Sequence, residues 1–427
     1  MADNKDKKVL NVPALRFPEF TEEWKEERLS KIAELSKGVG ISKEQLSEDG
    51  EPCILYGELY TKYKSEIIHK VISKTNIESS NLKRSKRNDV IIPCSGETAI
   101  DIAVARCVPF DNIILGGDLN IIRLHKDDGA FMAYQLNGKR KIDIAQLAQG
   151  VSVVHLYGEN IKAIKTYNPC LQEQQKIVKL LSMLDERIEV QNKIIEDLKK
   201  LKSAIAETLF CTPKESMPAK RVSPYNKEWK LIKLSDICQR VQTKNTGNQC
   251  RQVLTIAAQH GLVNQEDFFN KTVASENLEG YYLLQKGDFA YNKSYSGGYT
   301  WGAIKRLEWY DKGVLSPLYI CFRPDSSKVN ADFLAHYFES KKWHKGIADI
   351  AGEGARNHGL LNISVIDFFN TIHRIPDLDE QKDIARILNS LSSKLSCEQR
   401  VIQNLTMQRS YLLHKSTVYK GLHRVTV

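Results

Sequence analysis

Two long stretches of the chain place apolar residues at alternating intervals of four and three positions. Each stretch has nine such positions, seven of them apolar, which is typical of a coiled-coil seam rather than of an ordinary surface helix. A proline precedes each stretch and permits a helix to begin after it. The sequence therefore predicts two long helices, over 169–211 and 377–420. Their seam positions are Ile177, Leu181, Leu184, Ile188, Gln191, Ile195, Leu198, Lys202 and Ile205, then Ile384, Leu388, Leu391, Leu395, Glu398, Ile402, Leu405, Arg409 and Leu412.

The polar residues of the two seams fall at the same places in the repeat and favour one register. An antiparallel arrangement can set Lys202 opposite Glu398. The same register sets Gln191 opposite Arg409, and apolar residues meet in the other layers. A parallel arrangement would set Lys202 against Arg409, a pair of like charges. We therefore expect an intramolecular antiparallel coiled coil. The alternative is two separate amphipathic helices, each covering its own domain.

The chain is written twice. The segment LQEQQKIVKLLSML begins at Leu171 and LDEQKDIARILNSL begins at Leu378, so the two starts are 207 positions apart (378 minus 171). Upstream, EWKEERLSKI at Glu23 corresponds to EWKLIKLSDI at Glu228, 205 positions apart (228 minus 23). Between these matches the two halves share little beyond an aspartate at 89 and 288. Internal repetition of this kind predicts a common frame with pseudo-twofold symmetry that carries two different bodies.

The bodies between the repeated segments mix short β-type runs, such as DVIIP and LYICF, with short helical patterns such as ADFLAHYFESKKW. A proline-rich stretch, CTPKESMPAKRVSPYN, follows the first long helix and is a linker by composition. We expect an α+β chain with two mixed α/β domains in a repeat. The predicted division is 12–168, 169–211, 212–376 and 377–420.

Composition and charge narrow the class of protein. No apolar run is long enough to cross a membrane, and the charged start MADNKDKKVL gives no sign of a secretion signal, so we expect a cytoplasmic protein. The nine cysteines include no Cys-x-x-Cys pair, which gives no indication of a zinc site. The formal net charge of +10 suits a polyanionic partner such as nucleic acid.

Motifs for catalysis are weak. YNPC at Tyr167 has a likeness to the Asn-Pro-Pro-aromatic loop of adenine methyltransferases, but it lacks the second proline and the aromatic residue that stacks on a flipped base. PDLDEQK at Pro376 offers acidic residues and a lysine, yet they crowd the start of one helix instead of surrounding a metal. No phosphate-binding loop and no nucleophile signature are present in the sequence. We expect no catalytic residue and no metal ligand in this chain.

Four clusters have the chemistry of DNA contacts. Arginine can read guanine and asparagine can read adenine through paired hydrogen bonds, while lysines and hydroxyl groups contact phosphates. For each cluster the alternative is a solvated surface loop. The candidate residues are Lys83, Arg84, Lys86 and Arg87 in the first cluster; Lys139, Arg140 and Lys141 in the second; Lys293, Ser294, Tyr295 and Tyr299 in the third; and Arg356, Asn357 and His358 in the fourth.

The whole layout resembles the specificity subunit of type I restriction-modification enzymes. The resemblance rests on the twice-written pattern Pro-x-Leu-x-Glu-Gln-x-x-Ile-x-x-x-Leu, which starts at Pro169 and Pro376, and on AGEGARNHGLLNISVIDFFNTIHRIP before the second copy. The first half has LAQGVSVVHLYGENIKAIKTYNP in place of that last segment, so individual residues carry over less well there.

This resemblance implies a DNA-recognition subunit with no catalysis of its own. The two bodies would be target-recognition domains that each read half of a bipartite, asymmetric site in double-stranded DNA. The helices would be spacers that dock two methyltransferase subunits, with motor-endonuclease subunits joining for cleavage. S-adenosylmethionine and ATP with magnesium would belong to those partners, and this chain would hold no cofactor.

Two other functions remain open from the residues alone. A self-contained nuclease or methyltransferase would bind a metal or S-adenosylmethionine as an isolated chain. A protein-interaction scaffold could use the same helices, and strongly salt-dependent binding to duplex DNA would argue against it. The sequence names neither the target bases nor the gap between half-sites.

Overall fold

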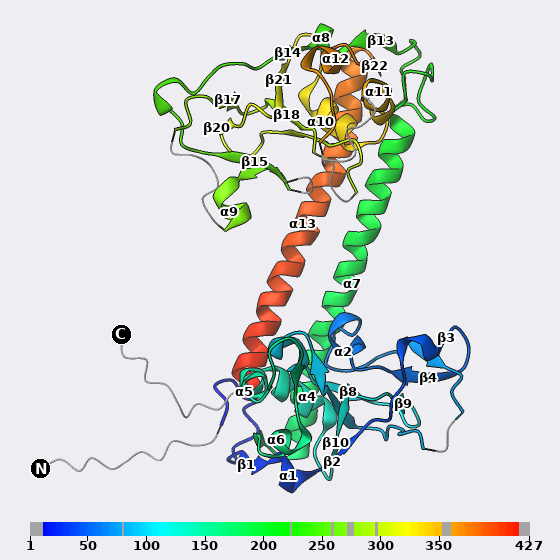
Figure 1. Cartoon of the computed structure of the whole chain (residues 1–427), viewed down its shortest axis with the longest axis vertical. Helices are drawn as coiled ribbons and strands as arrows, with labels where there is room; N and C mark the ends of the chain where they lie inside the picture. Colours follow the sequence, from blue (N-terminus) through cyan, green and yellow to red (C-terminus); the bar gives the residue numbers. More distant parts are fainter. Residues whose placement is uncertain are drawn as a thin grey trace, which may run out of the picture. The chain divides into compact units, whose positions relative to one another are not determined.

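A computed structural model describes residues 12–78, 81–222, 224–257, 260–270, 277–294, 298–351 and 360–417. Two compact units divide the chain. Unit 1 is formed by Met1–Asn192 with Arg400–Val427, and unit 2 by Lys193–Gln399. The boundary passes through both long helices, α7 (Leu171–Leu209) and α13 (Leu378–Thr417), which are labelled in Figure 1. Each unit therefore contains one part of each long helix.

A four-stranded antiparallel sheet with the order β2-β10-β6-β8 lies at the centre of unit 1. Its strand β6 is buried along its whole length. Since side chains alternate between the two faces of a strand, both faces of the sheet are covered at β6. Val90 and Ile92 join one hydrophobic cluster, and Ile91 joins another. The strands are β2 (Ala33–Lys37), β6 (Asp89–Pro93), β8 (Arg106–Val108) and β10 (Leu119–Leu124).

Smaller sheets and short helices complete unit 1. A second sheet has the order β3-β5-β4-β9, and two strand pairs, β1-β12 and β11-β7, lie apart from it. These strands are β1 (Lys25–Arg28), β3 (Leu46–Ser47), β4 (Glu51–Ile54), β5 (Ser73–Thr75), β7 (Ser95–Gly96), β9 (Ile114–Leu115), β11 (Val154–His155) and β12 (Lys165–Asn168). The helices are α1 (Leu29–Ile32), α2 (Glu58–Thr61), α3 (Ala99–Ile102), α4 (Gly129–Asn137), α5 (Arg140–Gln146) and α6 (Gly158–Lys162).

Unit 2 repeats the central sheet in the same order, β14-β21-β18-β19. Its pair β13-β22 corresponds to β1-β12 of unit 1. The strands are β13 (Lys230–Lys233), β14 (Cys238–Arg240), β18 (Phe289–Asn292), β19 (Ala303–Arg306), β21 (Ile320–Pro324) and β22 (Ile372–Ile375). The mixed α/β frame that the repeat predicts is therefore confirmed in both units.

The remaining elements of unit 2 differ from those of unit 1. Two separate antiparallel pairs, β15-β16 and β17-β20, take the place of the second four-stranded sheet. The strands are β15 (Leu254–Ala257), β16 (Gly261–Asn264), β17 (Tyr282–Gln285) and β20 (Lys312–Leu315). The helices are α8 (Leu234–Ile237), α9 (Gln265–Phe269), α10 (Ala331–Glu339), α11 (His344–Ile350) and α12 (Val365–Phe369). The bodies differ although the frame is shared.

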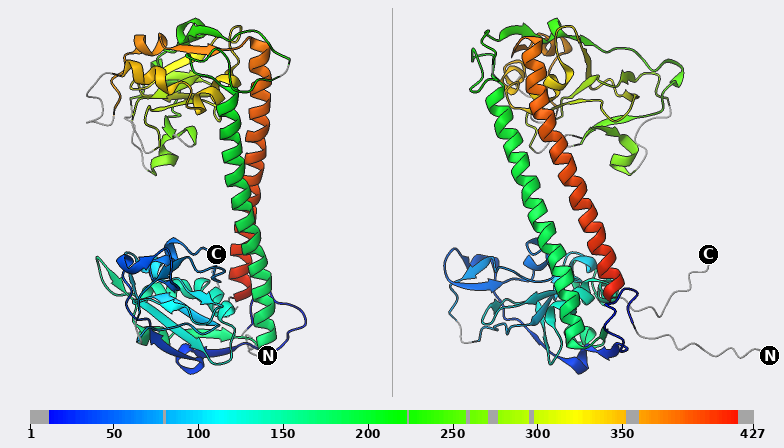
Figure 2. Two further views of the ribbon diagram at one scale, coloured as in Figure 1. Left: turned by 90° about the vertical axis from the view of Figure 1, so that its right-hand side faces the viewer. Right: turned by 180° about the vertical axis from the view of Figure 1, so that it is seen from behind.

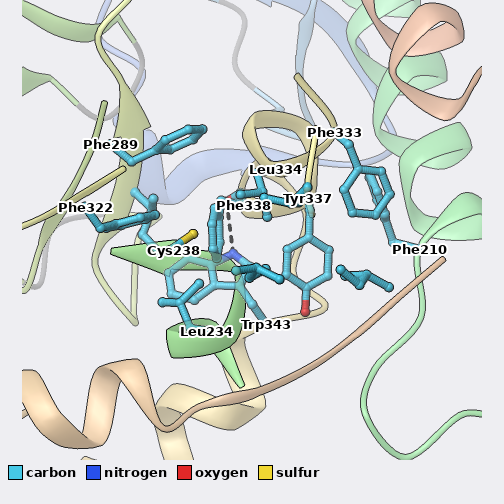
Figure 3. Close-up of a cluster of buried hydrophobic side chains, with 14 of the residues drawn as sticks. Phe210, Leu234, Cys238, Phe289, Phe322, Phe333, Leu334, Tyr337, Phe338 and Trp343 are labelled. Atoms are coloured by element: carbon cyan, nitrogen blue, oxygen red, sulfur yellow. Dashed lines mark hydrogen bonds between the residues drawn. The ribbon is translucent and has the colours of Figure 1, made fainter. Parts of the chain in front are cut away.

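Aromatic side chains fill the main core of unit 2, where α10 packs between the sheet and the long helices. Figure 3 shows Phe289 and Phe322 on the sheet side, and Phe333 facing Phe210, which follows α7 directly. Trp343 donates a hydrogen bond from Nε1 to the carbonyl oxygen of Phe338, 2.9 Å away, so its polar atom is satisfied in the core. Both long helices contribute apolar side chains to this cluster: Ile205, Ala206, Leu209, Ile384, Ala385, Leu388 and Leu391.

Exposure along the two long helices follows the sequence-predicted seam. From 186 to 204 of α7, the residues that are not exposed are Ile188, Gln191, Ile195, Leu198 and Lys202. From 393 to 411 of α13, they are Leu395, Glu398, Ile402, Leu405 and Arg409. The helices occupy Leu171–Leu209 and Leu378–Thr417, within the predicted ranges 169–211 and 377–420, of which 418–420 lie outside the described residues.

The polar pairs of the predicted register are corrected by the structure. Lys202 forms an ion pair with Glu339 on α10, with 2.9 Å between its Nζ and the carboxylate, and not with Glu398. Glu398 instead pairs with Lys394, one turn earlier in α13. Each unit supplies carboxylates of its own, and these are closer to the cations than the seam partners expected from the sequence.

Arg409 is the second corrected pair. It forms ion pairs with Asp185 of α7 and with Glu66 from the body of unit 1, and not with Gln191. A carboxylate is the stronger partner for a guanidinium, because it adds the attraction of opposite charges and can accept two parallel hydrogen bonds, which the single oxygen of an amide cannot.

A buried histidine gives unit 2 a pH-dependent stability. His373 on β22 lies between the hydroxyl groups of Tyr337 and Thr371, at 3.1 and 2.8 Å, and burial lowers its pKa to about 4. The unfolded chain therefore binds this proton more readily than the folded chain, so stability falls as the pH drops from about 6.5 towards 4. We expect a loss of about 3 kcal/mol from this residue across that range.

The matching position in unit 1 is Thr166, 207 residues earlier, which does not titrate. His373→Thr therefore removes the titrating group and introduces the side chain that unit 1 has at this position. Urea unfolding at pH 7 and pH 4 should show a smaller acid loss in the variant than in the wild-type chain. An equal loss in both proteins would mean that His373 is not the titrating group.

Candidate nucleic-acid interface

The repeated Glu-Gln motif anchors each body to the start of a long helix. In unit 1, Glu173 accepts two hydrogen bonds of 2.7 Å from the guanidinium of Arg16. Its neighbour Gln174 accepts from the backbone nitrogen of Asp128 and donates to the carbonyl oxygen of Pro169, at 2.8 and 3.0 Å. Figure 2 shows the segment before β1, coloured dark blue, beside the first turns of α7.

Unit 2 makes the same contacts with its own residues. Glu380 accepts from Arg221 at 2.8 and 2.7 Å, and Gln381 accepts from the backbone of Asn330 and donates to the carbonyl of Pro376, both at 2.8 Å. These glutamates and glutamines are nearly fully buried. The repeated motif is therefore a structural clamp between each body and its long helix.

A second repeated ion pair holds a surface turn in each unit. Asp89 pairs with Arg123 at 2.8 and 2.7 Å and accepts the backbone N–H of Lys86, while Asp288 pairs with Arg323 at 2.6 and 2.8 Å. Asp288 also accepts the backbone N–H of Gln285 at 2.7 Å. The aspartate shared by the two bodies thus fixes the turn that leads into β6 or β18.

Each of these turns presents basic side chains to solvent. In unit 1 the exposed residues are Lys86 and Arg87, followed by Asn88 with φ of 79°. In unit 2 the exposed basic residue is Lys286, followed by Gly287 with φ of 95°. The positive φ suits asparagine and glycine better than any other residue. Lys286 was missed as a candidate, although the alignment of Asp89 with Asp288 could have identified it.

The other residues of the first cluster are less available. Arg84 forms two hydrogen bonds with Glu51, at 2.6 and 2.9 Å, so its charge is already matched within unit 1. Ser85, which lies between Arg84 and Lys86 in the sequence, is buried, and Lys83 is half-buried. Of the four candidates, Lys86 and Arg87 are the exposed ones.

The second cluster begins α5 and is partly engaged in the fold. Arg140 pairs with Asp143 at 2.8 Å and lies over the ring of Tyr167, 5.5 Å from its centroid. Its side chain is only 15% exposed. Lys139 and Lys141 are half-buried. Arg140 therefore stabilises unit 1, which limits its reach towards a ligand.

The described residues of the third cluster lie beside the segment that follows the fourth cluster in the sequence. Lys293 donates from Nζ to the carbonyl oxygen of Ile363 at 3.3 Å, and its own carbonyl accepts from Leu361 at 2.9 Å. Ser294 forms a β-bridge with Leu360. The chain just before Tyr295 thus lies beside the chain that follows the fourth cluster. The residues that lie outside the described part of the chain are Tyr295, Arg356, Asn357 and His358.

Tyr299 is half-buried and packs against a hydrophobic cluster of unit 2, where burial raises its pKa. Its ring is part of the core rather than a free surface for base contacts. Among the described residues, no group of three or more His, Cys, Asp or Glu side chains is placed to hold a metal ion. In that same part of the chain, no helix is long and apolar enough to cross a membrane.

Comparison with known proteins agrees with this arrangement. The family model for the type I restriction modification DNA specificity domain matches twice, over residues 21–200 and 226–407. The MjaVIII type I restriction enzyme specificity subunit of Methanocaldococcus jannaschii is 22% identical over 437 residues, covering 96% of this chain and 95% of that protein.

Two solved structures share the fold. The type I restriction-modification S subunit of M. genitalium has a TM-score of 0.60 at 18% identity, covering 95% of this chain and 99% of its own. A chain from a study of complex assembly and conformational transition in the type I R-M system has a TM-score of 0.52 at 14% identity, covering 92% and 97%.

Proposed function

The chain belongs to the type I restriction-modification DNA specificity family, and on this premise we propose how it recognises DNA and its partners. Its two units read the two halves of a bipartite, asymmetric site in double-stranded DNA. The observation that carries this proposal is the repeat itself: both units have the same strand order and the same anchors, but different outer strands and loops. A shared frame with unlike reading surfaces suits a site whose halves differ in sequence.

We further propose that α7 and α13 pair as an antiparallel coiled coil that sets the gap between the half-sites. The low exposure of every seam position between 186 and 204, and again between 393 and 411, supports this pairing. At about 1.5 Å per residue, the 39 residues of α7 span about 58 Å, more than one turn of duplex DNA at roughly 34 Å.

We infer the partner subunits from the same family membership. Two methyltransferase subunits dock on the helices, and motor-endonuclease subunits join for cleavage in the cytoplasm. S-adenosylmethionine and ATP with magnesium belong to those subunits, and this chain contributes recognition without catalysis. The tight pairing of acidic residues with arginines, as at Glu173 and Glu380, is consistent with a structural use of its carboxylates.

The experiment that tests this proposal is methylation sequencing of a host with and without the chain. The expected result is one asymmetric, two-part motif that is methylated only when the chain is present. In binding assays, changing the bases of either half-site should weaken binding. Binding to such a duplex should still depend on the sequence of the other half-site. A single continuous motif, or none, would contradict the proposal.

The basic turn of unit 1 should contribute phosphate contacts. Replacing Lys86 and Arg87 with glutamine is expected to weaken binding to all duplexes and to reduce the slope of log K against log salt by up to about 2, roughly one per phosphate contact. The control is Arg84→Gln with Glu51→Gln, which leaves the net charge unchanged and should preserve the slope. Equal slopes in the wild-type chain and the first variant would place this turn away from DNA.

The contact made by Lys202 can be tested by double-mutant cycles in urea unfolding. Lys202→Met with Glu339→Gln should show a coupling energy of about 0.5–1 kcal/mol, since the pair is partly exposed. Lys202→Met with Glu398→Gln should show almost none. A larger coupling with Glu398 would restore the pairing that the seam pattern alone predicts.

A further inference from the structure

Trp309 differs from the other tryptophans of the chain because its side chain lies in solvent. The structure describes all five tryptophans. Trp24, Trp229 and Trp343 are 1–2% exposed, and Trp301 is half-buried against the aromatic core of unit 2. Trp309, in contrast, is 72% exposed. Tryptophan is enriched at binding surfaces, where a partner covers its large apolar ring.

Backbone hydrogen bonds tie the loop of Trp309 to the basic turn of unit 2. This loop joins β19 to β20, and the basic turn joins β17 to β18. Gly287 of the turn donates its N–H to the carbonyl oxygen of Leu307 at 2.9 Å, and Lys286 donates its N–H to that of Asp311 at 2.8 Å. The two contacts lie on either side of Trp309 along the loop. The exposed indole and the exposed lysine are therefore carried by adjacent loops that hold each other in place.

The side chains around the indole are charged rather than apolar. Lys286 is on the turn and Lys312 directly follows the loop, and both are exposed. Of the two acidic residues in the loop, Glu308 lies 2.9 Å from the guanidinium of Arg306, and Asp311 is exposed. An apolar protein surface would pack poorly on a ring surrounded in this way. Duplex DNA suits it better, because its sugars and base edges offer apolar contacts while its phosphates pair with lysines.

The frame shared by the two units does not account for Trp309. The carbonyl oxygens of Val108 in unit 1 and Leu307 in unit 2 are equivalent, since each accepts a backbone N–H of the basic turn, at 3.0 and 2.9 Å. The aromatic residue that then packs on the core is Phe110 in unit 1, two positions later, and Tyr310 in unit 2, three positions later. The loop of unit 2 is thus one residue longer. Trp309 lies in this longer part, outside the packing that both units need.

We propose that Trp309 contacts DNA when unit 2 reads its half-site. The indole packs against sugars and base edges of the duplex, and Lys286 and Lys312 face its phosphates. This role rests on the proposed function and deepens it, because it identifies the end of unit 2 that meets the duplex. It also distinguishes the units. Unit 1 presents Lys86 and Arg87 at the equivalent turn, whereas unit 2 places an aromatic ring beside a single lysine of the turn.

Quenching of tryptophan fluorescence by acrylamide tests this contact in the full chain. Since the other four tryptophans are buried or half-buried, Trp309 should account for most of the quenching. A duplex with the methylated motif, added at low salt, should lower the quenching constant at least twofold. Binding of the same duplex is measured in parallel by fluorescence anisotropy of a label on the DNA. In Trp309→Phe the quenching constant should be low from the start and should change little with DNA.

Affinity and its salt dependence separate the ring from the charges. Trp309→Ala should weaken binding of that duplex about tenfold, in the range of an aromatic contact with a base, without changing the slope of log K against log salt. Lys286→Gln should instead reduce that slope by about 1. The matched control is Leu318→Ala, since Leu318 is 73% exposed in the same unit but precedes β21, at the opposite end of β18. This control should change the affinity less than twofold.

Several results would overturn the contact and leave half-site reading intact. They are a bound duplex with unchanged acrylamide quenching, wild-type affinity in Trp309→Ala, and an equal loss of affinity in Leu318→Ala. Protection of Trp309 by methyltransferase subunits instead of by DNA would assign the ring to a protein partner and would also overturn it. If methylation sequencing finds no asymmetric two-part motif, the proposed function fails first, and the contact fails with it.

Discussion

Replacing Glu380 with alanine is expected to lower the free energy of unfolding of unit 2 by about 3–5 kcal/mol. Glu380 is 1% exposed and accepts hydrogen bonds from two nitrogens of the Arg221 guanidinium. The Arg221 side chain is 15% exposed. Removing one partner of such a pair leaves the other charge poorly solvated, which costs more than the pair contributed. Urea unfolding followed by circular dichroism measures the loss.

The neighbouring residue provides a matched control. Asp379 is one position away, its side chain is 80% exposed, and its partner Lys382 lies on the same helix surface. Asp379→Ala should cost less than about 1 kcal/mol, as exposed pairs usually do. The double variant Glu380→Met with Arg221→Met should recover much of the loss, because no charge is left unpaired. If Glu380→Ala is no more destabilising than Asp379→Ala, the clamp does not hold the body on α13.

The long helices could be predicted because their signal is local in the sequence. A residue on a helix repeats its environment every three or four positions, so seven apolar residues at nine seam positions indicate which face is covered. Between 186 and 204 of α7, and between 393 and 411 of α13, the residues that are not exposed are the predicted seam positions. The strand order of the bodies had no such signal, since strands as short as β8 and β9 join partners chosen by the whole fold.

The polar partners could not be predicted because they come from distant parts of the chain. Arg16 and Glu173 are 157 positions apart, and nothing between them in the sequence marks the pair. The same reason explains the errors at Lys202 and Arg409. Reasoning from two helices alone offered only seam partners, whereas the folded units bring in Glu339 and Glu66 from outside the helices.

The exposure of the basic clusters could be predicted only in part, for a related reason. Basic clusters are visible in the sequence, but whether a carboxylate already matches each charge is decided by the fold. Arg84 and Arg140 have such partners, whereas Lys86 remains exposed on a turn. The repeated aspartate, at the start of β6 and directly before β18, was visible in the sequence. Its role in holding equivalent turns became clear only from its pairing with arginine.

Lengthening both long helices should lengthen the gap in the recognised DNA motif. The insertion points are between residues 192 and 193 of α7 and between 399 and 400 of α13, where the two units divide. One heptad in each helix adds about 10 Å, roughly three base-pair steps of rise. Methylation sequencing should then report the same two half-sites with a gap about three base pairs longer. An unchanged gap would mean that the helices do not set this distance.

Helical phase makes this expectation sharper. Three base pairs also rotate one half-site about the duplex axis by roughly 100°, since a turn holds about 10 base pairs, whereas a heptad turns a helix by only about 20°. One inserted heptad should therefore weaken binding although the gap grows, because DNA must be twisted to meet both units. Three inserted heptads add about 32 Å, close to one full turn of the duplex. They should restore near wild-type affinity for a gap about nine base pairs longer. Loss of affinity that grows steadily from one to three heptads would instead indicate that the helices no longer pair when they are lengthened.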